Sequence, residues 1–142
     1  MNEEFTIQFD FQSCSVVIEN DCTSVWAYQI TSKEQDVAKD AFVISPIAPK
    51  EEFDYQSIKA GNPPKLVTKF ASNRAYNESF NESDFSVSES KNKDICIYFK
   101  NEPFAAIYAD EPRSYSKSLS AVCGFGNPWS EKLYVSAFMQ GS

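Results

Sequence analysis

Phe5-Thr6-Ile7-Gln8-Phe9-Asp10-Phe11-Gln12 alternates apolar and polar residues without interruption. Successive side chains of a β-strand point to opposite faces, so this period of two predicts a strand with one buried and one exposed face. A second apolar run follows at 15–19, and Asn20-Asp21 supplies turn residues before a third run at 24–30. The start of the chain therefore predicts three consecutive strands.

Short apolar runs separated by turn residues continue along the chain. They predict further strands at 41–45, 95–99, 104–109, 118–125 and 132–140, with shorter candidates at 52–56, 65–70 and 85–87. The polar residues 31–40 have room for one helical turn, and most of 72–94 is predicted to be a surface connection. About eight to ten short strands without alternating helices predict one all-β domain over 1–142, an antiparallel two-sheet β-sandwich. A closed barrel is the alternative.

The net charge of the chain narrows the classes of partner that it can bind. The 142 residues carry a formal net charge of −7 at pH 7. An acidic protein is repelled by phosphate backbones and by anionic lipid, so no nucleic-acid partner is expected. Contact with a membrane would have to use apolar or aromatic side chains on uncharged or zwitterionic lipid. The N-terminal residues lack the basic and apolar regions of a signal peptide, so we expect a cytoplasmic protein, or one released without a cleaved leader.

Catalytic and metal motifs are absent from the sequence. The chain has no histidine, which excludes Ser-His-Asp and Cys-His arrangements and His-containing zinc sites. Four scattered glycines form no phosphate-binding loop, and the four cysteines form no CxxC pair. We therefore expect no enzyme activity, no metal and no cofactor. The cysteines allow three disulfide connectivities, although the missing leader favours thiols.

Aromatic residues are the more informative feature. The 12 Phe and 7 Tyr exceed what a core of this size needs, and surplus rings are common on binding surfaces. Trp129 follows Asn127-Pro128 in a predicted turn, and Tyr108 and Tyr115 flank the polar loop 110–114. Such rings can contact a lipid headgroup, a sugar or a protein, or they can fold back and cap the core. The candidate binding residues are Trp129, Tyr115, Tyr108, Phe104 and Arg113.

Two segments resemble a known family. Ser15-Val16-Val17-Ile18-Glu19-Asn20, with the turn and strand after it, is similar to the N-terminal hairpin of the aegerolysins and related small β-sandwich toxins. Ile95-Cys96-Ile97-Tyr98-Phe99-Lys100-Asn101-Glu102-Pro103-Phe104-Ala105 resembles a later strand of that family, with Glu102 inserted in an Asn-Pro-Phe-like turn. The aegerolysin-like small subunit of binary insecticidal crystal toxins is a form that the chain resembles, and the actinoporins share a similar plan.

The resemblance covers less than a fifth of the chain, and the four cysteines have no counterpart in it. It implies an acidic, leaderless β-sandwich that recognises membrane lipids, in a family whose members commonly need a second protein component to form pores.

Three hypotheses about function follow. The first is membrane-lipid recognition, or a pore-forming-toxin-like activity, through the loop aromatics. The alternative is a carbohydrate- or protein-binding module, and the third is an enzyme with paired carboxylates such as those of Asp110-Glu111. The arrangement of the rings separates the first two, because a flat aromatic surface favours a membrane and a concave aromatic pocket favours a ligand.

Overall fold

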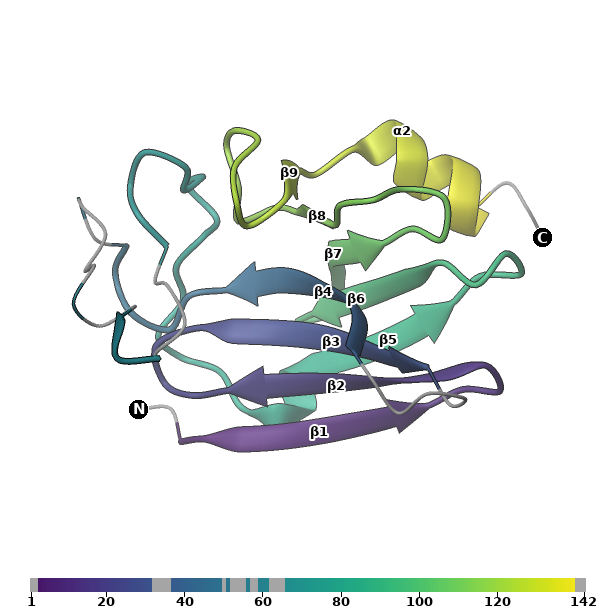
Figure 1. Ribbon diagram of the computed structural model, residues 1–142, viewed down its shortest axis with the longest axis horizontal. Helices are drawn as coiled ribbons and strands as arrows, with labels where there is room; N and C mark the ends of the chain where they lie inside the picture. Colours follow the sequence, from purple (N-terminus) through teal and green to yellow (C-terminus); the bar gives the residue numbers. More distant parts are fainter. Residues whose placement is uncertain are drawn as a thin grey trace.

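The structure is a computed structural model that describes residues 3–31, 37–49, 51, 56, 59–61 and 66–139. Its described strands form two sheets (Figure 1). The first sheet has the order β1-β2-β3-β4, with bounds Phe5–Asp10, Cys14–Asn20, Val25–Thr31 and Val37–Ile44. The second has the order β5-β6-β7-β8-β9, with bounds Phe85–Glu89, Ile95–Phe99, Glu102–Ile107, Tyr115–Ser116 and Asn127–Pro128. The prediction of an all-β, two-sheet sandwich is confirmed.

The alternation that opens the chain produces the inner face of the first sheet. β1 pairs with β2 in an uninterrupted antiparallel register from Phe5 opposite Asn20 to Asp10 opposite Ser15. The odd-numbered apolar side chains of β1 pack against a core shared by both sheets, whose buried members include Ile18 of β2 and Ile97 of β6. Full burial of each such aliphatic side chain contributes roughly 1.5–3 kcal/mol, so this shared core holds the two sheets face to face.

The hairpin between β6 and β7 follows from local conformation. Lys100 and Asn101 both have positive φ, at 51° and 67°, which is the backbone of a type I′ turn. This turn twists in the same sense as the flanking strands and therefore brings β7 back beside β6. The predicted strands at 95–99 and 104–109 are confirmed, with β7 beginning earlier, at Glu102.

A second hydrophobic cluster covers the outer face of the first sheet. Its buried members are Phe42, Leu66, Ala75, Leu119 and Phe125. The strands predicted at 65–70 and 118–125 are wrong, because the described residues of these segments form turns and isolated bridges, such as the one from Leu119 to Ala71. Their apolar side chains point down onto the sheet from loops, which gives short apolar runs without a continuous ladder.

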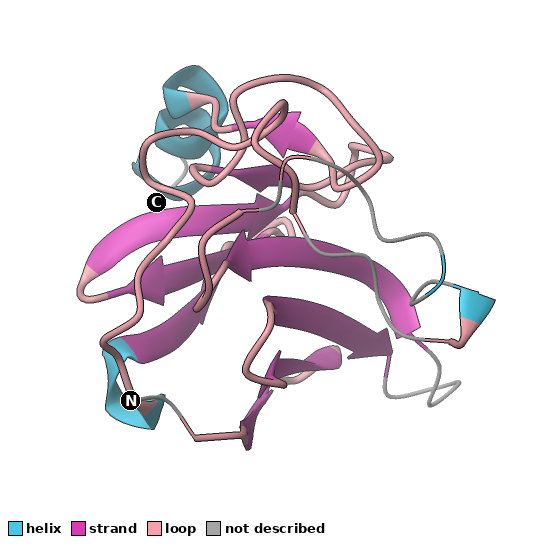
Figure 2. Cartoon of the chain, turned by 90° about the vertical axis from the view of Figure 1, so that its left-hand side faces the viewer, coloured by secondary structure: helices cyan, strands magenta, loops and turns pink. Residues whose placement is uncertain are grey.

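The strand predicted at 132–140 is also wrong. The chain there forms α2 (Glu131–Tyr134), continued by η2 (Val135–Met139) as a π-helix. Ser130 caps α2, because its Oγ accepts a hydrogen bond from the amide of Leu133 at 3.2 Å. Tyr134 and Phe138 are four residues apart and stack at 5.4 Å, which is a helical spacing that the apolar run concealed. Figure 2 shows this helical segment and η1 (Glu82–Asp84) at opposite ends of the second sheet.

Ser130→Ala tests this cap. We expect the substitution to destabilise the helical segment by about 1 kcal/mol, because the Leu133 amide loses its acceptor. Amide hydrogen exchange across 131–139 should become faster, while Ser136→Ala, at an exposed position of η2, should leave it unchanged. Equal exchange in both variants would contradict the capping role.

The remaining differences are local. β8 and β9 pair in parallel, so the second sheet is mixed where an entirely antiparallel sheet was expected. β4 begins at Val37 and therefore includes the last residues of the polar segment 31–40, which was predicted to have room for one helical turn. The candidate at 85–87 is confirmed as β5, whereas most of the candidate at 52–56 lies outside the described residues.

Cys14, Cys96 and Cys123 are free thiols in the structure. Cys96 lies under the helical segment, and burial raises the pKa of its thiol to about 12. A thiol of that kind stays protonated at neutral pH and acts as a small apolar side chain.

Candidate functional site

Trp129 lies between β9 and α2, and its ring is half-buried. The ring packs 5.4 Å from that of Tyr134, and its Nε1 donates a hydrogen bond to Glu131 Oε1 at 3.0 Å. The Lys117 ammonium lies over the ring, 5.0 Å from its centroid. The indole is therefore held by contacts with its own chain, in the arrangement in which the ring folds back.

Tyr108 and Tyr115 join the same group of rings. Tyr108 packs 5.5 Å from Tyr115 and 6.4 Å from Phe138. Together the five residues form an aromatic cluster beneath the helical segment: Trp129, Tyr134, Phe138, Tyr108 and Tyr115.

The exposure of these rings decides what they can contact. Tyr108 is only 4% exposed, and burial raises the pKa of its hydroxyl far above the ordinary value. Tyr115 is half-buried and donates a hydrogen bond to Glu111 Oε1 at 2.6 Å. Phe104 is 2% exposed and lies in the core, away from this cluster. Of the predicted binding rings, only Trp129 and Tyr115 reach the surface.

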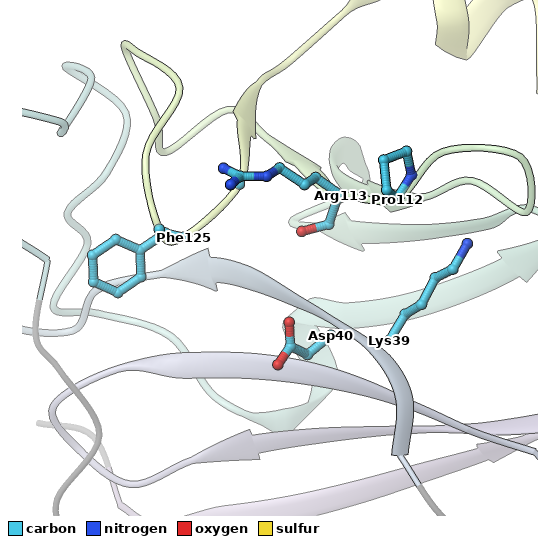
Figure 3. A pocket seen from close by; sticks show the side chains of 8 residues that line it. Lys39, Asp40, Pro112, Arg113 and Phe125 are labelled. Atoms are coloured by element: carbon cyan, nitrogen blue, oxygen red, sulfur yellow. The ribbon is translucent and has the colours of Figure 1, made fainter.

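Arg113 belongs to a different feature, a polar cleft of about 370 Å³ between the edge of the first sheet and two loops (Figure 3). β4 supplies one side of this polar cleft, and the loops before β8 and β9 supply the other. Its lining residues are Lys39, Asp40, Pro112, Arg113, Ser114, Gly124, Phe125 and Gly126. Figure 3 shows Lys39 and Asp40 projecting from the β4 side and the Arg113 guanidinium extending toward the loop of Phe125.

Lys39 builds the wall of the polar cleft. Its ammonium donates to three backbone carbonyls of the turn after β7, those of Tyr108, Ala109 and Glu111, at 2.8, 3.1 and 3.0 Å. An ammonium has three N–H donors, so these contacts use them all. Lys39 therefore fastens the loop of the second sheet to the first sheet, and it has no donor left for a ligand.

Arg113 and Asp40 are the charged groups that remain available. One nitrogen of the Arg113 guanidinium donates to the carbonyl of Cys123 at 2.8 Å. This bond orients the side chain along the cleft and leaves other N–H donors unused among the described residues. The neighbouring protein removes water from the Asp40 carboxyl and raises its pKa. The Arg113 guanidinium, a hydrogen-bond donor, and the Asp40 carboxylate, an acceptor, thus both line the polar cleft.

Gly126 and Phe125 form the floor. Gly126 has φ of +131°, and a Cβ at this position would lie 2.8 Å from the carbonyl oxygen of Ser114. Only glycine allows this approach, which also brings the amide of Asn127 to the Ser114 carbonyl at 2.9 Å. Phe125 is buried against Trp26 and Phe42, so the floor is continuous with the second hydrophobic cluster.

Most of the polar cleft is not evident from the sequence. The sequence predicts Arg113 as a binding residue. It predicts Lys39 and Asp40 to lie in a polar segment with room for one helical turn, and Phe125 and Gly126 to lie in a strand and a turn. The available signal was Gly124-Phe125-Gly126, because two glycines around one aromatic residue mark a special backbone. Nothing in the sequence indicates that this loop meets residues 39–40, since the sheet topology alone brings them together.

Asp40→Asn tests the electrostatics of the cleft. A raised pKa means that the folded protein disfavours the carboxylate, so this effect lowers stability at neutral pH and disappears as the pH falls below the ordinary value of 3.8. We expect the variant to melt at a slightly higher temperature than the parent at pH 7 and at the same temperature near pH 3. Asp110→Asn, at an exposed loop position, should leave the melting temperature unchanged at both pH values. A lower melting temperature at pH 7 would contradict the desolvation of Asp40.

None of the described helices is long and apolar enough to cross a membrane. Among the described residues, no group of three or more Cys, Asp and Glu side chains is placed to hold a metal ion. The resemblance to aegerolysins and the membrane-lipid hypothesis remain predictions. Comparison with protein-family models, curated proteins and solved structures finds no match to this chain.

Proposed function

We propose that this protein is a non-enzymatic recognition module whose polar cleft binds a neutral, hydroxyl-rich ligand, a carbohydrate. The observation that supports this most is the pairing of available groups, the Arg113 donors and the Asp40 acceptor, across one space of about 370 Å³. A sugar offers neighbouring hydroxyls that both accept and donate hydrogen bonds. Planar guanidinium and carboxylate groups bind such pairs with two bonds each.

The available hydrogen-bonding groups favour a ligand that both donates and accepts hydrogen bonds. The Lys39 ammonium is charged, but its three N–H donors are all held by backbone carbonyls, so it offers none to a ligand. One guanidinium donor and one carboxylate acceptor then remain, which suits the hydroxyls of a neutral sugar. The backbone of Gly124 and Gly126 gives close access to the floor without side chains in the way.

A glycan array followed by calorimetry of any sugar that binds tests the proposal. Arg113→Ala should weaken binding at least about tenfold, and Asp40→Asn should weaken it similarly, because each removes one of the two groups. Lys132→Ala, an exposed cation on α2, is the matched control and should bind as the parent does. A blank array, or binding that survives both cleft substitutions, would overturn the proposal.

Recognition of a membrane lipid is the second candidate, and a different observation favours it. Val122 and Met139 are 62% and 64% exposed, so both apolar side chains are open to solvent. Both lie on segments next to the aromatic cluster in sequence, and Trp129 is half-buried in that cluster. Apolar side chains of this kind can enter the surface of zwitterionic lipid without needing a basic patch.

Sedimentation with vesicles of phosphatidylcholine, sphingomyelin and cholesterol tests the second candidate. The parent protein should sediment with the vesicles, and Val122→Asp combined with Met139→Asp should abolish this, because each substitution places a carboxylate at the point of contact. Ser120→Asp, at an exposed position in the same loop as Val122, is the control. No sedimentation with any of these lipids would remove the hypothesis.

A further inference from the structure

The outer edge of β1 has backbone groups that no described strand uses. The amide of Phe11 donates to the carbonyl of Cys14 at 2.8 Å and closes the β1–β2 hairpin with a hydrogen-bonded pair. Hydrogen-bonded and non-hydrogen-bonded pairs alternate along an antiparallel ladder. With the observed register, the odd-numbered residues of β1 bond to β2. The N–H and C=O groups of Thr6, Gln8 and Asp10 therefore point away from the sheet.

Nothing in the described part of the chain covers this edge. β1 is the terminal strand of the first sheet, and none of the isolated bridges involves it. Figure 1 shows β1 at the lower border of the molecule, with no described segment beyond it. The edge therefore offers its backbone groups to another chain.

β1 also lacks the features that usually protect an edge strand. Natural edges carry proline, lysine, a bulge or a very short strand. β4, the other edge of this sheet, has two register shifts and Lys39, and β9 has two residues including Pro128. β1 has six residues in an unbroken register, with no proline or lysine. It is the longest regular edge among the described strands.

The core side of β1 is incompletely covered. Phe5, Ile7 and Phe9 pack against the shared core but are only partly buried. A further strand beside β1 would cover these side chains and satisfy the outward backbone groups together. The hydrophobic effect and the ladder hydrogen bonds then favour the same partner geometry.

We propose that two copies of this chain pair through β1, antiparallel, about a two-fold axis at Gln8. Gln8 then lies opposite the partner's Gln8, and Thr6 lies opposite the partner's Asp10. Every outward N–H and C=O of these three residues gains a partner in this register. Paired residues have the same parity, so Ile7 meets the partner's Phe9 on the core side and the two first sheets become one continuous sheet.

The charges of β1 favour a second copy of the chain as the partner, in the register centred on Gln8. Asp10 is the strand's single carboxylate, and it accepts hydrogen bonds from Gln8 Nε2 and Ser15 Oγ, both at 2.7 Å. In the register at Gln8 it faces a threonine. A register centred on Asp10 would place two carboxylates opposite each other, and one centred on Thr6 would leave the Asp10 backbone groups beyond the pairing. One register therefore uses the whole edge without a like-charge pair.

Charge substitutions at the axis test the proposal. Analytical ultracentrifugation of the parent should give a molar mass of twice the 16.0 kDa of one chain. The fraction of dimer should increase at high salt, because salt screens the net charge of −7 that opposes association. Gln8→Lys and Gln8→Glu should each raise the dissociation constant at least about tenfold, because the two-fold axis places like charges together. An equimolar mixture of the two variants should restore the dimer. Ser86→Lys, at an exposed position on edge strand β5, should have no effect.

A variant that strengthens the dimer provides a second test, which does not depend on disrupting the interface. Thr6→Lys places an ammonium opposite the partner's Asp10 and should lower the dissociation constant severalfold. Circular dichroism of each variant should match the parent, because these side chains are exposed. A parent that stays monomeric at millimolar concentration would overturn the proposal. So would a dimer that persists in both Gln8 variants, or a mixture of those variants that fails to associate.

Discussion

Phe42→Ala is expected to lower the free energy of unfolding by about 4 kcal/mol. Phe42 is 0% exposed and lies at the centre of the second hydrophobic cluster. Its ring contacts those of Trp26 and Phe125, with centroids 5.3 and 5.4 Å away. Truncation to alanine removes a buried ring and leaves a cavity between the sheet and the loops above it. This is a large share of the 5–15 kcal/mol that stabilises a typical domain.

Urea unfolding followed by tryptophan fluorescence measures this effect, because Trp26 borders the cavity. Phe42→Leu, which keeps most of the buried volume, should lose much less stability. Val122→Ala, at an exposed position in the covering loops, should lose almost none. If Phe42→Ala unfolds within 1 kcal/mol of the parent, the loops do not depend on this ring, and the second cluster does not hold them to the sheet.

Gly126→Ala is expected to cost about 3 kcal/mol and to disrupt the polar cleft. The backbone at φ of +131° disfavours any side chain, and the new Cβ would lie 2.8 Å from the Ser114 carbonyl oxygen. That oxygen belongs to the backbone, so it cannot rotate away. To relieve the contact, the loop before β9 must move away from the loop before β8, which also weakens the hydrogen bond from the Asn127 amide.

Gly124→Ala is the matched control, because this glycine lines the same cleft and a Cβ there would meet nothing within 4 Å. Thermal unfolding should place Gly124→Ala with the parent and Gly126→Ala well below both. Any sugar that binds the parent should lose affinity for Gly126→Ala even at a temperature where that variant is folded. Equal stability of the two variants would show that the loops tolerate a side chain at Gly126.

The strands of this protein can be predicted from the sequence where strands that pair in space also follow one another in the chain. β1, β2 and β3 are joined by short turns, and each has a side chain period of two with one face on the core. The β6–β7 hairpin is equally local, because Lys100 and Asn101 supply its turn. In such segments the alternation, the turn residues and the final packing all favour the same structure, so the pattern alone predicts it.

The prediction failed where apolar residues pack from outside the sandwich. Leu119 and Phe125 cover the outer face of the first sheet from a loop, and Tyr134 and Phe138 cover the second sheet from a helical turn. A short apolar run looks the same whether it is a buried strand, a covering loop or a helix with one apolar side. The difference depends on which surface the run meets, and that surface is made by residues far away in the chain.

The same distinction applies to the candidate site. Composition alone excludes histidine chemistry and shows an acidic chain with an excess of aromatic rings. The strand pattern predicts the β-sandwich, and the neighbours of Arg113 in the sequence place it in a polar loop. The burial of Tyr108 and the placement of Arg113 and Asp40 in one cleft cannot be predicted in this way, because they depend on how β4 lies against loops more than seventy positions later in the chain. Local residue patterns specify strands and turns through short-range sterics and side-chain periodicity. Long-range packing of one sheet on another assembles the polar cleft and closes the aromatic cluster, and no local pattern encodes that contact.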